Sequence, residues 1–182
     1  MKKRALTWMI AVGIVTAGTF ARAGFSADST TTKHLTVATV ASADTVAPGA
    51  RVSLVVEIVP KPDMHVYAPG QKDFIPVSLT LAAHDAVKAE TARFPAAEKL
   101  EVKELGETHL VYTKPFRIVQ DVTIAKRAVV KGSGTGNSTI TVNGTLKYQA
   151  CDTSICYAPV SVPVTWTLAL QGSVPAAVKK HE

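Results

Sequence analysis

Cys151 and Cys156 are the residues whose type and spacing could do chemistry. They are the only cysteines among the 182 residues, and four residues separate them. Two thiols this close in sequence can close to a disulfide and open again, exchanging two electrons with the thiols of another protein. The pair is therefore a candidate for dithiol–disulfide exchange.

A structural disulfide is the plain alternative for the same pair. In the chain-entropy model a loop this short stabilises a fold by only about 2 kcal/mol, whereas closing about 100 residues would give nearly 5 kcal/mol. A short loop can also hold the bond away from its preferred torsion, which makes it easier to reduce. We favour a redox role, and the structural disulfide stays open as the alternative.

The alternation of side chains around the pair predicts which sulfur is exposed. Counted back along the preceding strand, Cys151 shares the polar face, whereas Cys156 is in phase with the apolar face of the following strand. This pattern predicts that Cys151 is exposed and Cys156 is shielded. Asp152, directly after Cys151, disfavours a thiolate there, and no Lys, Arg or His is adjacent in sequence to activate it.

Strand patterns flank the cysteines and continue through most of the chain. In residues 50–59 the apolar side chains alternate with polar or smaller ones, which is typical of a half-buried strand. About eight short strands separated by turn signals predict an all-β fold, an immunoglobulin-like antiparallel β-sandwich. Residues 96–109 are charged and weakly patterned, which favours a loop or a hairpin arm. The other strand patterns lie at residues 35–41, 75–83, 112–125, 139–150 and 160–170.

The first residues have the pattern of a secretory signal peptide. Residues 2–4 are basic, residues 5–20 carry no charge, and Ala-Arg-Ala at 21–23 fits the small-x-small cleavage rule. A spanning helix needs about 20 apolar residues, so the pattern predicts cleavage after Ala23 and export to the periplasm, with no stable membrane insertion afterwards.

The rest of the chain divides into a lead-in, one domain and a tail. We predict a flexible lead-in at 24–34, a single immunoglobulin-like domain at 35–170 and a disordered tail at 171–182. The first 23 residues hold four of the 20 Lys and Arg residues and none of the 14 Asp and Glu residues, so the remainder carries a formal charge of +2. No basic patch with interleaved aromatic residues remains, and nucleic-acid binding is not expected.

Metal and cofactor signals are weak, and we predict neither. Met64, His65 and the two cysteines would be soft ligands for copper if the fold brought them together, but their spacing gives no reason for this. The other histidines are scattered and are expected to be solvated: His34, His84, His109 and His181.

The cysteine segment, "YQACDTSICYAPVSVPV" at residues 148–164, resembles a known family. It is similar to the periplasmic N-terminal domain of the DsbD thiol:disulfide interchange reductases. The similarity lies in the Tyr-Gln before the first cysteine, the acidic Asp152 after it, the second cysteine followed by Tyr157-x-Pro, and the valine-rich final strand. The order of strands is also similar, so the resemblance covers roughly residues 35–170.

The resemblance implies an immunoglobulin-like sandwich whose cysteine pair carries electrons. The electrons would pass from a membrane-embedded thiol reductase to periplasmic thioredoxin-fold proteins, and because the sequence ends at residue 182 we expect a separate protein to supply them. In the family the second cysteine, here Cys156, forms the mixed disulfide, and Cys151 then closes the disulfide. This conflicts with the alternation above, and we favour the resemblance because the turn between the cysteines can shift the phase.

The resemblance also implies a cap loop over the cysteines. By position this loop falls at residues 103–108, "KELGET", where Glu104 is followed by Leu105 in place of the expected aromatic residue. Tyr67 resembles the family's tyrosine near the site. Ordinary packing is the alternative for Tyr67 and Leu105. For the whole chain, the alternative function is a non-catalytic binding or chaperone-like module with a structural disulfide.

Overall fold

The computed structural model describes residues 28–102, 106–126 and 139–171, and all of these that form regular structure are β-strands. Within them no helix is long and apolar enough to cross a membrane. The predicted signal peptide at 1–23 and nearly all of the predicted tail at 171–182 lie outside the described residues. The all-β prediction is confirmed.

One antiparallel sheet of five strands forms the first layer of the sandwich. Its outermost strand lies in the lead-in that we expected to be flexible, and this expectation is wrong for residues 28–31 because they pair along their whole length with the next strand. In spatial order the strands are β1 (Asp28–Thr31), β2 (Leu35–Ala41), β4 (Arg51–Pro60), β10 (Phe116–Ile124) and β7 (Val87–Ala89).

A second sheet of four strands forms the opposite layer, and its two long central strands carry the cysteine segment between them. Its short edge strand at residues 45–46 runs parallel to its neighbour, whereas the other pairs are antiparallel. In spatial order the strands are β3 (Thr45–Val46), β13 (Val160–Leu170), β11 (Thr139–Tyr148) and β6 (Ser78–Leu81).

The core lies between these two sheets, on the faces that the alternation predicted. In β4 the side chains of Val52, Leu54, Val56 and Ile58 are at most 2% exposed, which confirms the period-2 pattern. Trp166 of β13 reaches across the core, where its indole N–H lies 3.2 Å from the carbonyl oxygens of Val40 and Val55. Burial of apolar side chains from both sheets is the main stabilising contribution to this sandwich.

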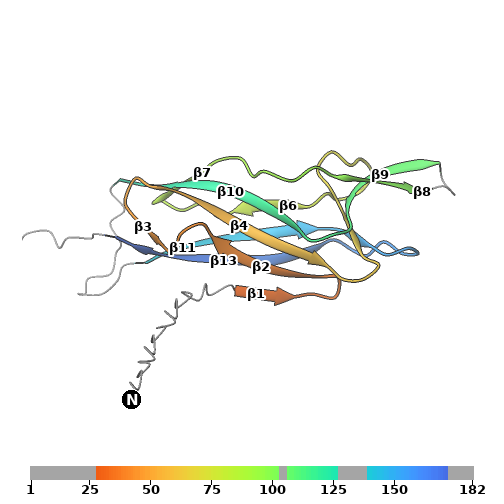
Figure 1. Cartoon of the computed structure of the whole chain (residues 1–182), viewed down its shortest axis with the longest axis horizontal. Helices are drawn as coiled ribbons and strands as arrows, with labels where there is room; N and C mark the ends of the chain where they lie inside the picture. Colours follow the sequence, from red (N-terminus) through yellow and green to blue (C-terminus); the bar gives the residue numbers. More distant parts are fainter. Residues whose placement is uncertain (1–27, 103–105, 127–138, 172–182) are drawn as a thin grey trace, which may run out of the picture.

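A third, smaller sheet lies at one end of the molecule, where β8 and β9 extend beyond the sandwich (Figure 1). Within the stretch at 96–109, which we expected to be a loop or hairpin arm, residues 98–102 form β8 and residues 107–109 begin β9, and these two strands pair antiparallel. In spatial order the strands are β12 (Ala150–Cys151), β5 (His65–Tyr67), β9 (Glu107–Tyr112) and β8 (Glu98–Val102).

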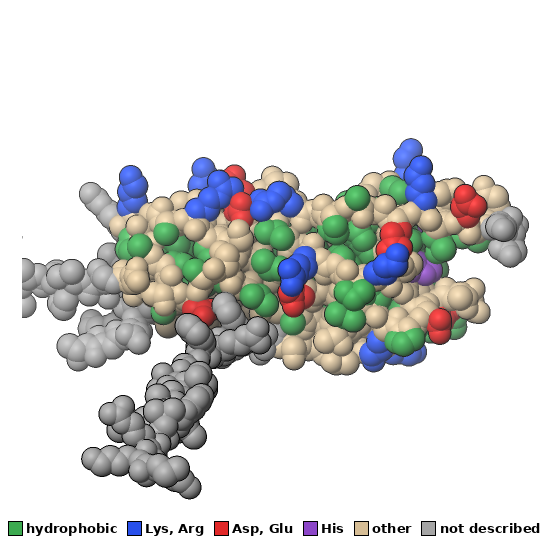
Figure 2. Space-filling model, viewed as in Figure 1, with side chains coloured by type: hydrophobic (Ala, Val, Ile, Leu, Met, Phe, Trp, Pro, Cys, Tyr) green, Lys and Arg blue, Asp and Glu red, His purple; other side chains and the backbone are tan. Residues whose placement is uncertain are grey.

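Charged side chains of both signs are interspersed on the face of the described residues that Figure 2 shows. Several form pairs across neighbouring strands: Arg117 of β10 lies 2.6 Å from Glu57 of β4, and Arg51 of β4 lies 2.8 Å from Asp121 of β10. This mixed surface agrees with the small net charge expected after the first 23 residues are removed.

Candidate functional site

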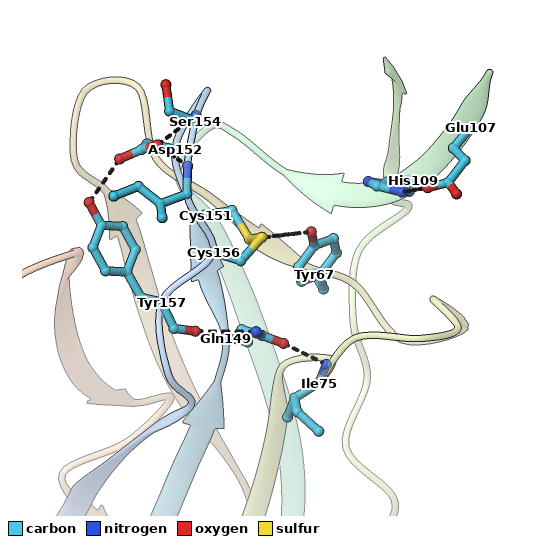
Figure 3. The surroundings of a disulfide bond; sticks show 11 residues. Tyr67, Ile75, Glu107, His109, Gln149, Cys151, Asp152, Ser154, Cys156 and Tyr157 are labelled. Atoms are coloured by element: carbon cyan, nitrogen blue, oxygen red, sulfur yellow. Dashed lines mark hydrogen bonds and ion pairs between the residues drawn. A yellow bond between two sulfur atoms is a disulfide. The ribbon is translucent and has the colours of Figure 1, made fainter. Parts of the chain in front are cut away.

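The fold brings three short backbone segments side by side at the end of the sandwich. Cys151 of β12 lies opposite His65 of β5 on one side and forms an isolated bridge with Cys156 on the other. The two cysteine Cα atoms are 4.0 Å apart, and their sulfurs form a disulfide (Figure 3). The sequence folds this way because β11 ends at Tyr148 and a turn at residues 152–155 reverses the chain.

The two cysteine residues differ in exposure, and the difference is opposite to the one that the alternation predicted. Cys151 is 1% exposed, whereas Cys156 is an exposed residue. The alternation was wrong because Gln149 interrupts the strand, so that Ala150 and Cys151 are both buried although they are neighbours. The chain then pairs with β5 of the third sheet instead of continuing along β13.

Tyr67 contacts both sulfurs. Its hydroxyl lies 3.3 Å from Sγ of Cys151 and 3.4 Å from Sγ of Cys156, and the residue is 1% exposed (Figure 3). Burial, together with the negative charge of Glu107, raises the pKa of the Tyr67 phenol above 10.0. The phenol therefore stays protonated and can donate a hydrogen bond to a sulfur that carries negative charge.

Asp152 organises the turn between the cysteines. One of its carboxylate oxygens accepts the backbone N–H groups of Ser154 and Ile155, each at 2.7 Å, and the other accepts the Tyr157 hydroxyl at 2.8 Å (Figure 3). These hydrogen bonds, those from the backbone most of all, lower the pKa of Asp152 below 3.8. The Asp152 carboxylate is therefore charged at neutral pH and holds the turn that leads to Cys156.

Gln149 and Phe74 tie a neighbouring segment to the site. The Gln149 side chain accepts the backbone N–H of Ile75 at 3.0 Å and donates to the carbonyl of Tyr157 at 3.2 Å (Figure 3). Phe74 stacks on Tyr67, with ring centroids 4.2 Å apart. We did not single out Phe74 from the sequence, because it carries no pattern that points to the cysteines, and Gln149 entered only as part of the Tyr-Gln motif of the resemblance.

A cavity of about 580 Å³ opens beside the disulfide and is lined by both cysteines. Glu104 and Leu105 of the expected cap loop lie outside the described residues, and only Gly106 to Thr108 of that loop are described. Two neighbours of the expected loop, Glu101 and Val102, line the cavity. Its wall thus includes residues from all four strands of the third sheet and from the turn after Cys151.

The cavity also brings Met64 and His65 to the cysteines, as the copper hypothesis required. However, no group of three or more His, Cys, Asp or Glu side chains in the described part of the chain is arranged to hold a metal ion.

Two histidines that we expected to be solvated are buried: His34 is 5% exposed and His109 is 7% exposed. His109 pairs with Glu107 at 2.9 Å, and His34 packs against Tyr157 with ring centroids 4.5 Å apart.

Burial, with a smaller contribution from His109, lowers the pKa of His65 below 6.5, although Asp152 opposes the shift. No histidine is adjacent to Cys151 in the chain, but the strand pairing places His65 opposite it.

Comparison with known proteins places the chain in a family. The model of the family "Thiol:disulfide interchange protein DsbD, N-terminal" matches residues 32–166. No curated protein matches the chain.

Two solved structures are also similar, both at low sequence identity. The N-terminal periplasmic domain of ScsB from Proteus mirabilis is 13% identical, with a TM-score of 0.46. The match covers 75% of this chain and 47% of the ScsB chain, so this chain spans about half the length of the ScsB chain. The reduced N-terminal domain of Neisseria meningitidis DsbD is 18% identical with a TM-score of 0.43, covering 73% of this chain and 88% of that one. On the family match over residues 32–166, the chain belongs to the DsbD N-terminal domain family and contains a thiol:disulfide interchange domain.

Proposed function

We propose that this protein is a periplasmic module that passes electrons through Cys151 and Cys156, between a membrane-embedded thiol reductase and thioredoxin-fold proteins. The observation that carries the proposal is the difference in exposure between the two cysteine residues. Cys156 is exposed and can meet a partner's sulfur, whereas Cys151 is buried behind it. An accessible attacking cysteine with a second cysteine beside it suits two-step disulfide exchange, because the rate of attack depends on access to the sulfur.

In the forward direction the reduced pair gives two electrons to a partner disulfide. The Cys156 thiolate attacks one partner sulfur, the partner's disulfide breaks, and its second sulfur leaves as a thiolate. Cys151 then attacks Sγ of Cys156 and displaces the first partner sulfur, which leaves the partner as a dithiol and this protein as the disulfide. The reductase reverses these steps to restore the two thiols.

The surroundings of Cys156 fit contact with another protein. Ile155, directly before it, is 58% exposed, and Ile75 in the neighbouring segment is 38% exposed. Exposed apolar side chains around a reactive sulfur favour a transient protein contact, because docking removes their surface from water. Asp152 and Tyr157 hold the turn in one shape for that contact.

The trapping experiment uses the Cys151→Ala variant in a periplasmic extract. The lone Cys156 should form a mixed disulfide that cannot be resolved, visible as a larger species on a non-reducing gel and lost on adding dithiothreitol. Mass spectrometry should identify the attached protein as having a thioredoxin fold. Cys156→Ala is the matched control and should trap far less, because Cys151 is buried. Equal trapping by the two variants would contradict the assigned roles.

The reduction potential separates this function from the alternative of a binding module with a structural disulfide. Equilibration with glutathione should give a potential above about −300 mV, because a disulfide far below that value resists cellular thiols. Periplasmic location rests on the predicted signal peptide at residues 1–23, and on the periplasmic origin of the similar ScsB domain. Amino-terminal sequencing of the exported protein should begin at Gly24.

A further inference from the structure

His65 and Cys151 lie directly opposite each other in the antiparallel pair of β5 and β12. Directly opposite residues in such a pair have Cβ atoms about 4.5–5.5 Å apart and point to the same face. Tyr67, two residues further along β5, shares that face with His65, and its hydroxyl contacts Sγ of Cys151 at 3.3 Å. The imidazole and the buried sulfur therefore lie on the same side of the third sheet.

The same cavity is lined by His65, Cys151 and Cys156, so the imidazole is also close to where a partner's sulfur must arrive. The His65 ring contacts the Tyr67 ring edge-on, with centroids 5.6 Å apart. The other titratable groups that line this cavity are Asp63, Tyr67, Glu101, His109 and Asp152; Glu107 pairs with His109, and Tyr157 donates a hydrogen bond to Asp152. Because burial lowers the pKa of His65, its imidazole is neutral at neutral pH and has a nitrogen lone pair available.

The buried Cys151 thiol needs a nearby base that can accept its proton. Cys151 can resolve a mixed disulfide only as a thiolate, yet it is 1% exposed and has little contact with water that could take its proton. The neighbouring carboxylate of Asp152 further disfavours the negative charge. A neutral base on the same face removes this obstacle.

We propose that His65 accepts the proton of the Cys151 thiol when Cys151 resolves the mixed disulfide, and this proposal rests on the proposed function. In that step the S–H bond of Cys151 breaks and the proton moves to the imidazole. The thiolate attacks Sγ of Cys156, a new sulfur–sulfur bond forms, and the bond from Cys156 to the partner breaks. The electron pair leaves on the partner's sulfur, and the imidazolium returns the proton to it.

The test isolates the resolving step with a small disulfide, 5,5′-dithiobis(2-nitrobenzoate). One equivalent is mixed with the fully reduced protein at a fixed pH between 5 and 9, where Cys156 forms the mixed disulfide and releases a first nitrothiobenzoate. The attack by Cys151 on this mixed disulfide then releases the second nitrothiobenzoate. Absorbance follows both equivalents separately.

In the wild-type protein the rate of the second release should rise with pH and level off once His65 is neutral, below pH 6.5. In His65→Gln it should be about 100-fold slower at pH 7, the lower end of general-base effects. The rate of the second release in His65→Gln should also rise about tenfold per pH unit, because hydroxide must then remove the Cys151 proton. The first release should be unchanged. His84→Gln, whose imidazole lies outside the cavity lining, is the matched control and should behave as wild type.

A second variant keeps the test decisive if His65→Gln disturbs the fold. His65→Glu restores a proton acceptor, so its second release should be faster than that of His65→Gln and should level off at lower pH. The role of His65, but not the proposed function, is overturned if the rate of the second release in His65→Gln is within threefold of the wild-type rate. It is also overturned if that rate in His65→Glu is as slow as in His65→Gln. No first release from the wild-type protein overturns the proposed function together with it.

Discussion

The rings of Tyr67 and Phe74 stack face to face, with centroids 4.2 Å apart and planes 12° apart. Phe74 comes from the segment between β5 and β6, and the next residue of that segment is hydrogen-bonded to Gln149 in front of the first cysteine. The segment is thus held against the site by an aromatic stack and a hydrogen bond. Phe74 of this segment covers the Tyr67 phenol, which contacts both sulfurs, so removing the Phe74 ring should change the rate at which the disulfide is reduced.

Replacing Phe74 by alanine should therefore loosen Tyr67 and open the cavity. Loss of the aromatic pair and of part of its buried area should lower the free energy of unfolding by about 1–3 kcal/mol. Reduction of the disulfide by dithiothreitol should become several-fold faster, as measured by stopped-flow. Ile75→Ala in the same segment is the control, because its side chain is 38% exposed, and it should change both quantities much less. Unchanged reduction kinetics in Phe74→Ala would contradict a covering role.

Replacing Tyr67 by phenylalanine keeps the ring but removes the hydroxyl beside the sulfurs. A hydrogen bond contributes about 1 kcal/mol, so the Cys156 thiolate of the reduced protein should be less favoured and its alkylation by iodoacetamide at pH 7 about fivefold slower. Tyr112→Phe is the matched control, because the Tyr112 hydroxyl donates to the carbonyl of Pro95 and not to sulfur. An equal effect of the two variants would show that Tyr67 acts through general stability.

Alternation alone predicted much of the sandwich. Alternate side chains of β4 and β13 lie in the core because each is an uninterrupted strand of one layer, so a period of two survives along its length. The same rule failed at the cysteines, where Gln149 breaks the strand and two consecutive residues become buried. Cys151 is buried beside Ala150 because this segment pairs with β5 of the third sheet, and no local pattern in residues 148–156 predicts that pairing.

The resemblance supplied what alternation could not, but only where this sequence matches the family. It pointed to Tyr67 and Asp152, and both lie at the disulfide. It did not point to Phe74 or His65, which lie more than 70 residues from the cysteines in the sequence. Phe74 reaches the site by stacking on Tyr67, and His65 reaches it by strand pairing. No local sequence pattern predicts long-range contacts of this kind.

Reduction of the disulfide should leave the domain folded. The bond closes a loop of only a few residues, so in the chain-entropy model its loss costs about 2 kcal/mol. The core between the two large sheets does not depend on it. Urea unfolding with and without a phosphine reductant should therefore give two cooperative transitions with similar slopes and slightly different midpoints. Loss of cooperativity in the reduced protein would show that the disulfide is a major structural bond.

Asp121 should make the domain sensitive to acid. Hydrogen bonds from Arg93, Ser53 and Arg51 hold the pKa of its carboxyl far below 3.8. Because the folded-state pKa is depressed, this contribution is present above the unfolded value near 3.8 and is lost as the pH falls below it. Urea unfolding at pH values from 7 to 2 should show this loss. Asp121→Asn should be less stable at pH 7 and should lose less on acidification. Parallel pH profiles for the two proteins would contradict the assignment.

The Asp152 carboxylate should control the order of the turn that carries Cys156. Asp152→Ala removes the acceptor of the Ser154 and Ile155 amides, and hydrogen exchange at these two amides should become about tenfold faster. Asp152→Asn keeps one acceptor oxygen but loses the bond from Tyr157, so it should have a smaller effect. The depressed pKa of Asp152 means that the wild-type turn keeps its protection above pH 3.8 and loses it as the pH falls further.

Tyr157→Phe is the matched control for this turn, because it removes the same side-chain hydrogen bond from the other partner. If Asp152 and Tyr157 act through that bond, Tyr157→Phe and Asp152→Asn should have similar effects on exchange, and the double variant should add little to either. Additive effects would instead mean that the two side chains stabilise the turn independently. In that case the Asp152 carboxylate would hold the turn through the backbone amides alone, and Tyr157 through its packing against His34.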